Sequence, residues 1–272
     1  MSKKILLDAG HYTNYNQSAV HKAYYEGNAM WTLQKYLKRE LESYGFKVDV
    51  TRVSRDKDLS LNARGSMARG YDCFISLHSN ACGSESVDRV VIIKGYDQPD
   101  TLAAKFGSEL TKVMGVKQKY QIMTRKTTSG GEYYGVLRSS KAAGVADRFI
   151  IEHGFHTNTN TAKWLCDENN LKKIAQAEAK ILAEHYKVNK PSKPTGTTST
   201  STKTKWSNGD YNCKVKATAN LNIREGRGTD YKVIKTIPKG TVFTVGYVNN
   251  NWGSTWDFGK VGYFSCDYID KV

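Results

Sequence analysis

Three short apolar segments of this chain each lead into a side chain that can bind a metal ion or transfer a proton. LLDAGH ends in His11, CFISLHSN contains His78 and RFIIEHGF contains Glu152. Near-continuous apolar runs of this length are typical of buried parallel strands. Ligands bind to open α/β sheets at the edge formed by the carboxyl ends of the strands. We therefore expect these three side chains to converge on one edge of a sheet.

The apolar periodicity predicts strands that alternate with helices along the first two thirds of the chain. The expected strands cover 3–8, 46–52, 72–78, 89–94 and 147–152, and the expected helices cover 29–44, 60–68, 101–114 and 171–186. This alternation indicates an α/β fold with a mostly parallel sheet flanked by helices.

The last third of the chain changes in composition twice. Residues 188–205 are rich in Pro, Thr, Ser and Lys and contain no acid, which is typical of a linker. Over 206–272, short β-prone runs alternate with Gly, Asn and Asp turns, which predicts a small all-β barrel. We thus expect a catalytic domain at 1–187, a linker at 188–205 and a β domain at 206–272.

The formal net charge of +15 is shared by both parts of the chain. Residues 1–187 carry 28 basic and 20 acidic side chains, and residues 188–272 carry 13 and 6. Such an excess favours a polyanionic partner, either nucleic acid or the anionic polymers of a bacterial wall. No nucleic-acid-binding motif is present, so we expect no nucleic-acid partner. No apolar run reaches 18 residues, so we expect no insertion into a membrane.

The cysteines and the first residues bear on where the protein acts. The five cysteines are scattered and include no CxxC pair. This spacing argues against a disulfide framework and against a thiolate zinc site. The apolar run after Lys3 and Lys4 is too short for a secretory signal. We therefore expect the chain to lack its own route through the general export pathway.

A catalytic zinc ion takes three protein ligands from His, Glu or Asp and leaves one position for water. His11 and His78 supply two imidazoles, and a third ligand must lie nearby. Glu26 opens the first helix, where an acid is also favoured by the helix dipole alone. Glu152 ends a buried strand, where desolvation raises a carboxyl pKa toward that of a general base, although a buried ion pair is the alternative. From the local pattern alone, Glu26 and Glu152 could exchange roles.

The other histidines are weaker candidates. His153 should point to the opposite face of its strand from Glu152. His156 and His21 fall in loops, where a satisfied or solvated imidazole is the simpler interpretation. His185 lies on the last helix, far from the expected edge.

Several motifs together make the first 187 residues resemble the zinc-dependent N-acetylmuramoyl-L-alanine amidases of the amidase-3 type. The motifs are ILLDAGH, a Glu at the start of the first helix, VDVTR, LSLNARGSMA, FISLHSNA and IIEHGFHTN. The resemblance implies that His11, Glu26 and His78 bind Zn²⁺ and that Glu152 is catalytic. One departure is YTNYNQSAVHKAYY after His11, where the family usually has Gly-rich sequence.

The C-terminal segment resembles a bacterial SH3 domain of the wall-binding kind. LNIREGRGTDYKVIKTIPKG is similar to the opening stretch of that family, and Trp252 with VGYFSCDYI is similar to its closing strands. Aromatic rings offer flat faces for sugar or peptide, so Tyr231, Trp252, Trp256 and Tyr263 are candidate wall-binding residues. A barrel of this size also needs aromatic core residues, and we expect two of these four to lie inside.

These resemblances imply a peptidoglycan hydrolase that cleaves the amide bond between N-acetylmuramic acid and L-alanine. Asn80 and Arg138 are candidate donors to substrate, although a surface ion pair explains Arg138 equally well. With no signal peptide, the favoured setting is host lysis by a phage endolysin, which would be made in the cytoplasm of the bacterial host and act on the cell wall after its release. The alternatives are a bacterial autolysin or sporulation amidase and, in a different class, a wall-binding protein with an inactive catalytic domain.

Overall fold

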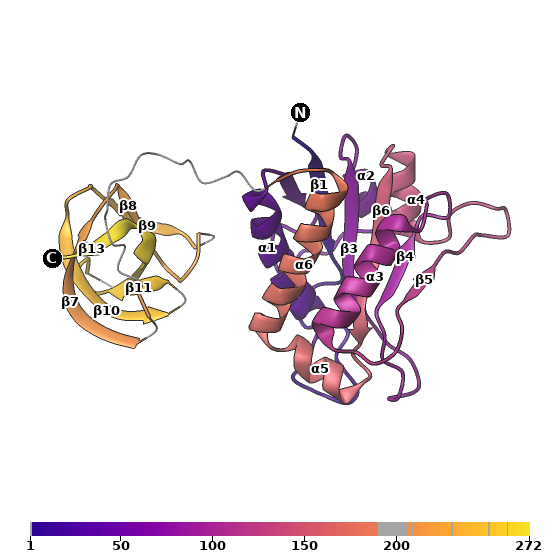
Figure 1. Cartoon of the computed structure of the whole chain (residues 1–272), viewed down its shortest axis with the longest axis horizontal. Helices are drawn as coiled ribbons and strands as arrows, with labels where there is room; N and C mark the ends of the chain where they lie inside the picture. The colour runs from indigo at the N-terminus through magenta and orange to yellow at the C-terminus, as the bar shows by residue number, and fades with distance from the viewer. Residues whose placement is uncertain (1, 190–205, 208, 230, 250, 260) are drawn as a thin grey trace. The chain divides into compact units, whose positions relative to one another are not determined.

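The computed structural model describes residues 2–189, 206–207, 209–229, 231–249, 251–259 and 261–272. The chain divides into two compact units, one on each side of the segment 190–205 (Figure 1). Most of the predicted linker lies outside the described residues, so that assignment stays a prediction. Val188 at its start packs against the first unit's core, and its N–H donates to Ala183 O at 2.8 Å.

The first unit contains a six-stranded mixed sheet with the order β2-β1-β3-β6-β4-β5. Four neighbouring strands, β2, β1, β3 and β6, are parallel, whereas β4 runs antiparallel to β6 and parallel to β5. The predicted α/β class with a mostly parallel sheet is therefore confirmed. The strands are β1 (Lys4–Ala9), β2 (Lys47–Val50), β3 (Cys73–Asn80), β4 (Val91–Lys94), β5 (Gln121–Met123) and β6 (Asp147–Phe155).

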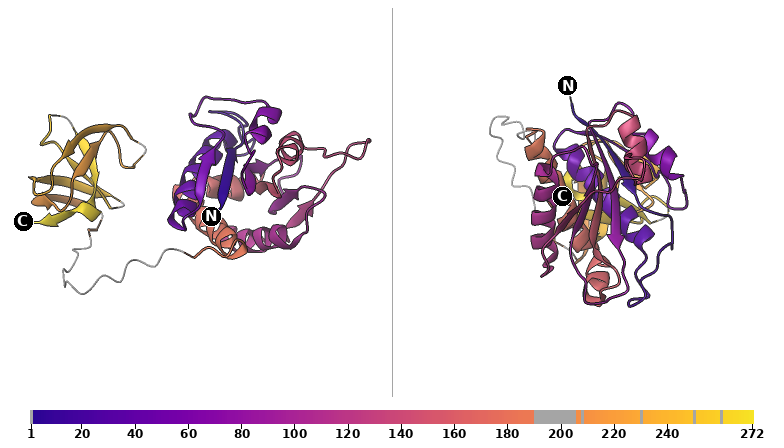
Figure 2. Two further views of the ribbon diagram at one scale, coloured as in Figure 1. Left: turned by 90° about the horizontal axis from the view of Figure 1, so that it is seen from above. Right: turned by 90° about the vertical axis from the view of Figure 1, so that its right-hand side faces the viewer.

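Helices cover both faces of this sheet (Figures 1 and 2). The long helices α1, α3 and α6 pack over one face, and the short helices α2 and α4 pack together over the other. The helices are α1 (Glu26–Ser43), α2 (Leu61–Ser66), α3 (Thr101–Met114), α4 (Gly135–Ala142), α5 (Thr159–Leu165) and α6 (Glu168–His185). Among the described residues, no helix is long and apolar enough to cross a bilayer.

Side-chain alternation along the strands determines which face receives the polar residues. Ile75 and Leu77 of β3 enter the core beneath α1 and α6, so Phe74 and His78 face the α2 and α4 side. Strand β6 repeats this pattern, and its register pairs Glu152 directly with His78. The apolar strand patterns of the sequence thus bring His78 and Glu152 together on one face.

Sequence periodicity located the long elements but not three short ones. Helix α1 begins at Glu26, as expected. Ser60 caps α2 by accepting a hydrogen bond from Ala63 N at 3.3 Å, which was also expected. Strand β5 and helices α4 and α5 were not predicted, because segments of three to eight residues show too little periodicity.

The second unit is a seven-stranded antiparallel sheet with the order β13-β7-β10-β11-β12-β8-β9, which confirms the predicted all-β composition. A single turn of 3₁₀ helix, η1 (Cys266–Tyr268), precedes the last strand. The strands are β7 (Gly209–Ala217), β8 (Leu221–Arg224), β9 (Val233–Ile237), β10 (Val242–Asn249), β11 (Trp252–Thr255), β12 (Gly262–Ser265) and β13 (Ile269–Lys271).

The expectation that two of the four candidate aromatics lie in this core was wrong. Tyr231 and Trp256 are exposed, and Trp252 and Tyr263 are only partly buried. The core ring of strand β12 is Phe264, which leaves its neighbour Tyr263 on the opposite face. Phe264 lies against its cross-strand partner at residue 253, where a Cβ atom would stand 2.4 Å from the ring, so only glycine fits.

Candidate metal centre

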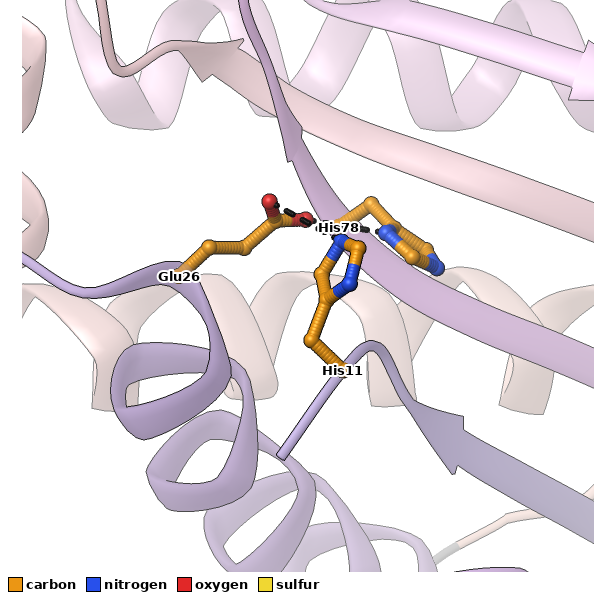
Figure 3. A group of neighbouring side chains, drawn as sticks. All are labelled: His11, Glu26 and His78. Carbon is orange, nitrogen blue, oxygen red and sulfur yellow. Dashed lines mark hydrogen bonds and ion pairs between the residues drawn. The ribbon is translucent and has the colours of Figure 1, made fainter. Parts of the chain in front are cut away.

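His11, Glu26 and His78 converge at the carboxyl ends of β1 and β3 (Figure 3). One ligand atom from each residue lies within 4.8 Å of the other two. Glu26 stands between the imidazoles, with Oε2 3.2 Å from His11 Nε2 and Oε1 2.9 Å from His78 Nδ1. The two imidazole rings meet edge to face with centroids 5.1 Å apart. The structure thus brings together the three residues that the sequence nominated as metal ligands.

Local backbone geometry positions these side chains. His11 lies two residues after the end of β1 and has a φ of 60°, a left-handed conformation that turns the chain out of the sheet. A Cβ atom on Gly10 would lie 2.3 Å from His78 Cε1, so glycine is required for the two strands to present their histidines this closely. Glu26 is the first residue of α1, which leaves its side chain free to point back toward the sheet.

Hydrogen bonds hold the Glu26 carboxylate in the ionised state. The side chain is only 1% exposed, and burial alone would raise its pKa. Hydrogen bonds and charge from His11 and His78 outweigh burial and hold the Glu26 pKa well below its usual range. The amide of Asn16 and the backbone N–H of Ser79 also donate to this carboxylate, the latter at 3.0 Å.

The ring nitrogen of His78 that faces away from Glu26 belongs to a buried relay. His78 Nε2 lies 3.1 Å from Ser76 Oγ, and Ser76 Oγ donates to Asp8 Oδ2 at 2.7 Å. Thr51 Oγ1 donates to the other oxygen of Asp8 at 2.5 Å. A hydroxyl that donates to Asp8 can accept from His78, so the relay holds a proton on Nε2. The proton on Nδ1, which here is shared with Glu26, is the one that a metal ion would replace.

Glu152 lies beside this group but outside it. Burial raises the pKa of Glu152. The positive charge of His78 lowers this pKa, the negative charge of Glu26 raises it, and the resulting pKa is about 7. Its Oε2 atom is buried and has no hydrogen-bond partner among the described residues. A carboxyl group with a raised pKa and a free oxygen is suited to accept a proton near neutral pH.

The donor set fits a catalytic zinc ion. Two imidazole nitrogens and one carboxylate oxygen are the ligand combination that zinc takes in many hydrolytic sites. His78 must be neutral to bind a metal; burial lowers its pKa, but Glu26 overcomes this and raises it to about 9 in the protein without an ion. Metal binding should therefore release a proton from this histidine.

The remaining predicted residues occupy different surroundings. Asn80 ends β3, and its side-chain oxygen accepts from Ala81 N at 2.8 Å. Arg138 is exposed and donates to the carbonyls of Glu132 and Tyr133, each at 3.1 Å. A substrate role for Asn80 or Arg138 stays a prediction.

The other histidines lie outside the metal-ligand group. His153 is fully buried on the opposite face, as expected, between His78 O at 2.9 Å and Glu178 Oε1 at 3.0 Å. His156 is also buried, and its Nδ1 lies 2.9 Å from Ser79 Oγ. His185 lies 3.1 Å from Asp147 at the far end of the sheet, and His21 is partly exposed in the loop before α1.

Two residues that the sequence analysis did not nominate stand next to His11. The Tyr15 ring stacks on the His11 imidazole, and the Tyr12 ring contacts Tyr15. The available signal was the tyrosine-rich segment after His11, which differs from the Gly-rich sequence of the resembled family.

Comparison with known proteins agrees with the fold. The family model for N-acetylmuramoyl-L-alanine amidase matches residues 5–184. A probable cell wall amidase LytH of Staphylococcus epidermidis is 28% identical over 186 residues, which are 68% of this chain and 58% of that protein. The chain therefore spans little more than half the length of this curated relative.

Solved structures show the same fold at lower identity. The catalytic domain of CwlV from Paenibacillus polymyxa matches with a TM-score of 0.59 and 20% identity, over 69% of this chain and 99% of that one. The CwlD amidase from Clostridioides difficile, solved in complex with the GerS lipoprotein, matches with a TM-score of 0.56 and 21% identity, over 68% and 99%.

A helix-flanked mixed sheet with a two-histidine, one-carboxylate group at its carboxyl edge defines the class of α/β metal-site hydrolases. Within that class, the family match covers most of the first unit. The chain belongs to the N-acetylmuramoyl-L-alanine amidase family of the amidase-3 type.

The relay behind His78 gives the first prediction. Ser76→Ala removes the hydroxyl that joins Asp8 to His78, and we expect the zinc affinity to fall about 10- to 100-fold. Thr51→Val is the matched control, because it removes the other hydroxyl that donates to Asp8 without contacting His78. Zinc competition with a chromophoric chelator measures both affinities. Equal losses of zinc affinity in the two variants would show that the hydrogen bonds to Asp8 support the metal site, and not the contact of Ser76 with His78.

Proposed function

We propose that this protein is a zinc-dependent N-acetylmuramoyl-L-alanine amidase that acts on bacterial peptidoglycan. It would hydrolyse the amide bond between N-acetylmuramic acid and L-alanine of the stem peptide. The observation that carries the proposal is the close group of His11, Glu26 and His78 beside a carboxyl group with an unpaired oxygen. Family membership supports the choice of bond.

We assign the proton transfers to Glu152, and its buried, unpaired Oε2 atom supports this. When bound, zinc supplies Lewis-acid chemistry, which polarises the scissile carbonyl and acidifies water. Glu152 takes a proton from the attacking water as the new C–O bond forms. It then returns this proton to the nitrogen of L-alanine as the C–N bond breaks, so that one water is consumed and a free amine and a carboxyl group result.

For the C-terminal unit we propose binding to the wall in the manner of a bacterial SH3 domain. The support is its antiparallel sheet, the basic charge of residues 188–272 and the exposed rings of Tyr231 and Trp256. A weak binder tethered to the amidase raises the local enzyme concentration on an insoluble substrate.

As the biological setting, we propose host lysis by a phage endolysin, with a bacterial autolysin or sporulation amidase as the alternative. Strong positive charge in both parts of the chain favours rapid capture by anionic wall polymers, which suits a lytic role. Expression inside the host separates the settings. An endolysin lyses cells only when a second protein permeabilises the membrane, whereas lysis without that protein would contradict the endolysin setting.

Replacement of the proposed base tests the reaction. Glu152→Gln keeps the size of the side chain but removes its basic oxygen, and we expect amidase activity to fall about a hundred- to ten-thousand-fold. Zinc content should remain at one ion per chain, because Glu152 is not in the ligand group. Mass spectrometry of digested walls reports new L-alanine amino termini. An active Glu152→Gln variant would remove Glu152 from this role, and an inactive wild type with bound zinc would favour the wall-binding alternative.

The pKa of Glu152 predicts the acidic limb of the pH–rate profile. The carboxylate form is the active one, so activity is lost as pH falls through the Glu152 pKa. We expect the midpoint between the ordinary value of 4.5 and about 7, since a bound cation favours the ionised form. Initial rates at constant zinc occupancy measure it. A flat profile down to pH 4.5 would contradict a buried general base.

The exposed aromatics predict where the wall binds. Tyr231→Ala with Trp256→Ala removes side chains that are 46% and 62% exposed, and we expect wall binding to weaken at least about five-fold. Tyr268→Ala is the matched control, because Tyr268 is 49% exposed in the same unit and was not a candidate. Cosedimentation with purified walls measures binding. An equal effect of Tyr268→Ala would indicate non-specific contact.

A further inference from the structure

The loop after β1 carries two exposed tyrosines in a row with the ligand His11. The Tyr15 ring stacks on the His11 imidazole at a centroid distance of 4.8 Å and an angle of 22°. The Tyr12 ring follows at 4.8 Å from Tyr15, tilted by 44°. Tyr12 and Tyr15 are 38% and 43% exposed, so the row offers open aromatic surface at the edge of the metal centre.

The backbone of this loop is held firmly, although its two rings are exposed. A Cβ atom on residue 27 would lie 1.9 Å from Tyr12 O, so Gly27 is needed for the loop to approach α1. Tyr15 O accepts from Gly27 N at 3.3 Å. Asn14 and Asn28 exchange hydrogen bonds at 2.8 and 3.0 Å.

The backbone conformation of two asparagines in the loop adds to this constraint. Asn14 and Asn16 have φ values of 57° and 56°, which asparagine tolerates better than other residues with side chains. A fixed backbone that presents exposed tyrosines lowers the entropy lost on binding, because each ring has few rotatable bonds. The loop has the properties of a preformed binding surface.

We propose that Tyr12 and Tyr15 form a stacking subsite for the pyranose ring of N-acetylmuramic acid. This inference rests on the proposed function and extends it by assigning the two sides of the scissile bond. The C–H face of a pyranose is apolar and packs on aromatic rings, while its hydroxyl and acetamide groups remain at the rim. Stacking next to His11 would place the ring at the metal centre.

The positions of the tyrosine loop and of Glu152 favour this orientation. In the sheet order, β1 with the tyrosine loop lies on one side of β3, and β6 with Glu152 lies on the other. In the proposed reaction Glu152 returns a proton to the nitrogen of L-alanine, so the peptide half of the substrate lies on the β6 side.

The sugar half of the substrate then lies on the β1 side. The sugar ring is neutral and suits the exposed tyrosine surface there. Stacking of the peptide on Tyr12 and Tyr15 would instead direct the nitrogen of L-alanine away from Glu152.

The test uses the full zinc-loaded chain and a soluble N-acetylmuramoyl tripeptide. Tyr12→Ala with Tyr15→Ala should raise KM about ten-fold and change kcat less than about two-fold, since stacking on a non-reacting ring is lost equally from ground and transition states. Tyr12→Phe with Tyr15→Phe should retain the wild-type KM, because the rings remain. Tyr268→Ala, which removes an exposed tyrosine of the other unit that is not a candidate binding residue, is the control and should not change KM.

Saturation-transfer NMR separates sugar from peptide. With the Glu152→Gln protein, which binds without turnover, the pyranose ring protons should receive saturation. The double alanine change should remove that signal and leave the signal of the alanine methyl group. Tyr12→Ala alone, whose ring does not stack on His11, repeats the test if the double variant loses zinc.

Three outcomes overturn the inference. Loss of the peptide signal with the ring signal retained would assign the tyrosines to the stem. An unchanged KM in the alanine variants, with the probe still cleaved, would remove the subsite and leave the amidase function standing. Absence of both cleavage and binding of the probe by the zinc-loaded wild type would contradict the proposed function itself, and the subsite with it.

Discussion

The whole site depends on the buried carboxylate of Glu26. Its two oxygens lie between His11 and His78, and they also accept hydrogen bonds from Asn16 and from the backbone of Ser79. Helix α1, the loop before it and strands β1 and β3 are thus joined at one anion. A buried carboxylate is costly unless it is fully paired, so these contacts fix the segments relative to one another. A bound zinc ion would replace part of the pairing between Glu26 and the two histidines, and the same three side chains would remain around it.

Much of this arrangement could be predicted from the sequence. His78 and Glu152 follow long apolar runs, and a buried parallel strand is the simplest structure for such a run. Alternation then correctly separated Glu152 from His153, which lies on the other face with Glu178. The convergence of His11 with His78 follows from the parallel pairing of β1 with β3. These predictions succeeded because strand period and sheet polarity are properties of the backbone.

The errors concern features that tertiary contacts decide. Which aromatics of the second unit are buried depends on strand register, and Phe264 rather than Tyr263 or Trp252 fills the core opposite Gly253. The loop that carries Tyr12 and Tyr15 has no periodicity, and its shape comes from Gly27, left-handed asparagines and contacts with α1. Ser76 and Asp8 look like ordinary strand residues in the sequence. The pairing of β1 with β3 brings them side by side and allows their hydrogen bond. None of these contacts has a signature in local sequence.

The two carboxylates that the local pattern could not tell apart are separated by their surroundings. Glu26 accepts several hydrogen bonds, which hold its pKa low and keep it charged. Glu152 is buried without such donors, and the charge of Glu26 further raises its pKa. One residue therefore remains an anion that can hold a cation, and the other gains and loses a proton near neutral pH. Because the charge of Glu26 helps to raise the pKa of Glu152, ligand and base are coupled, and the division of roles is a property of the pair.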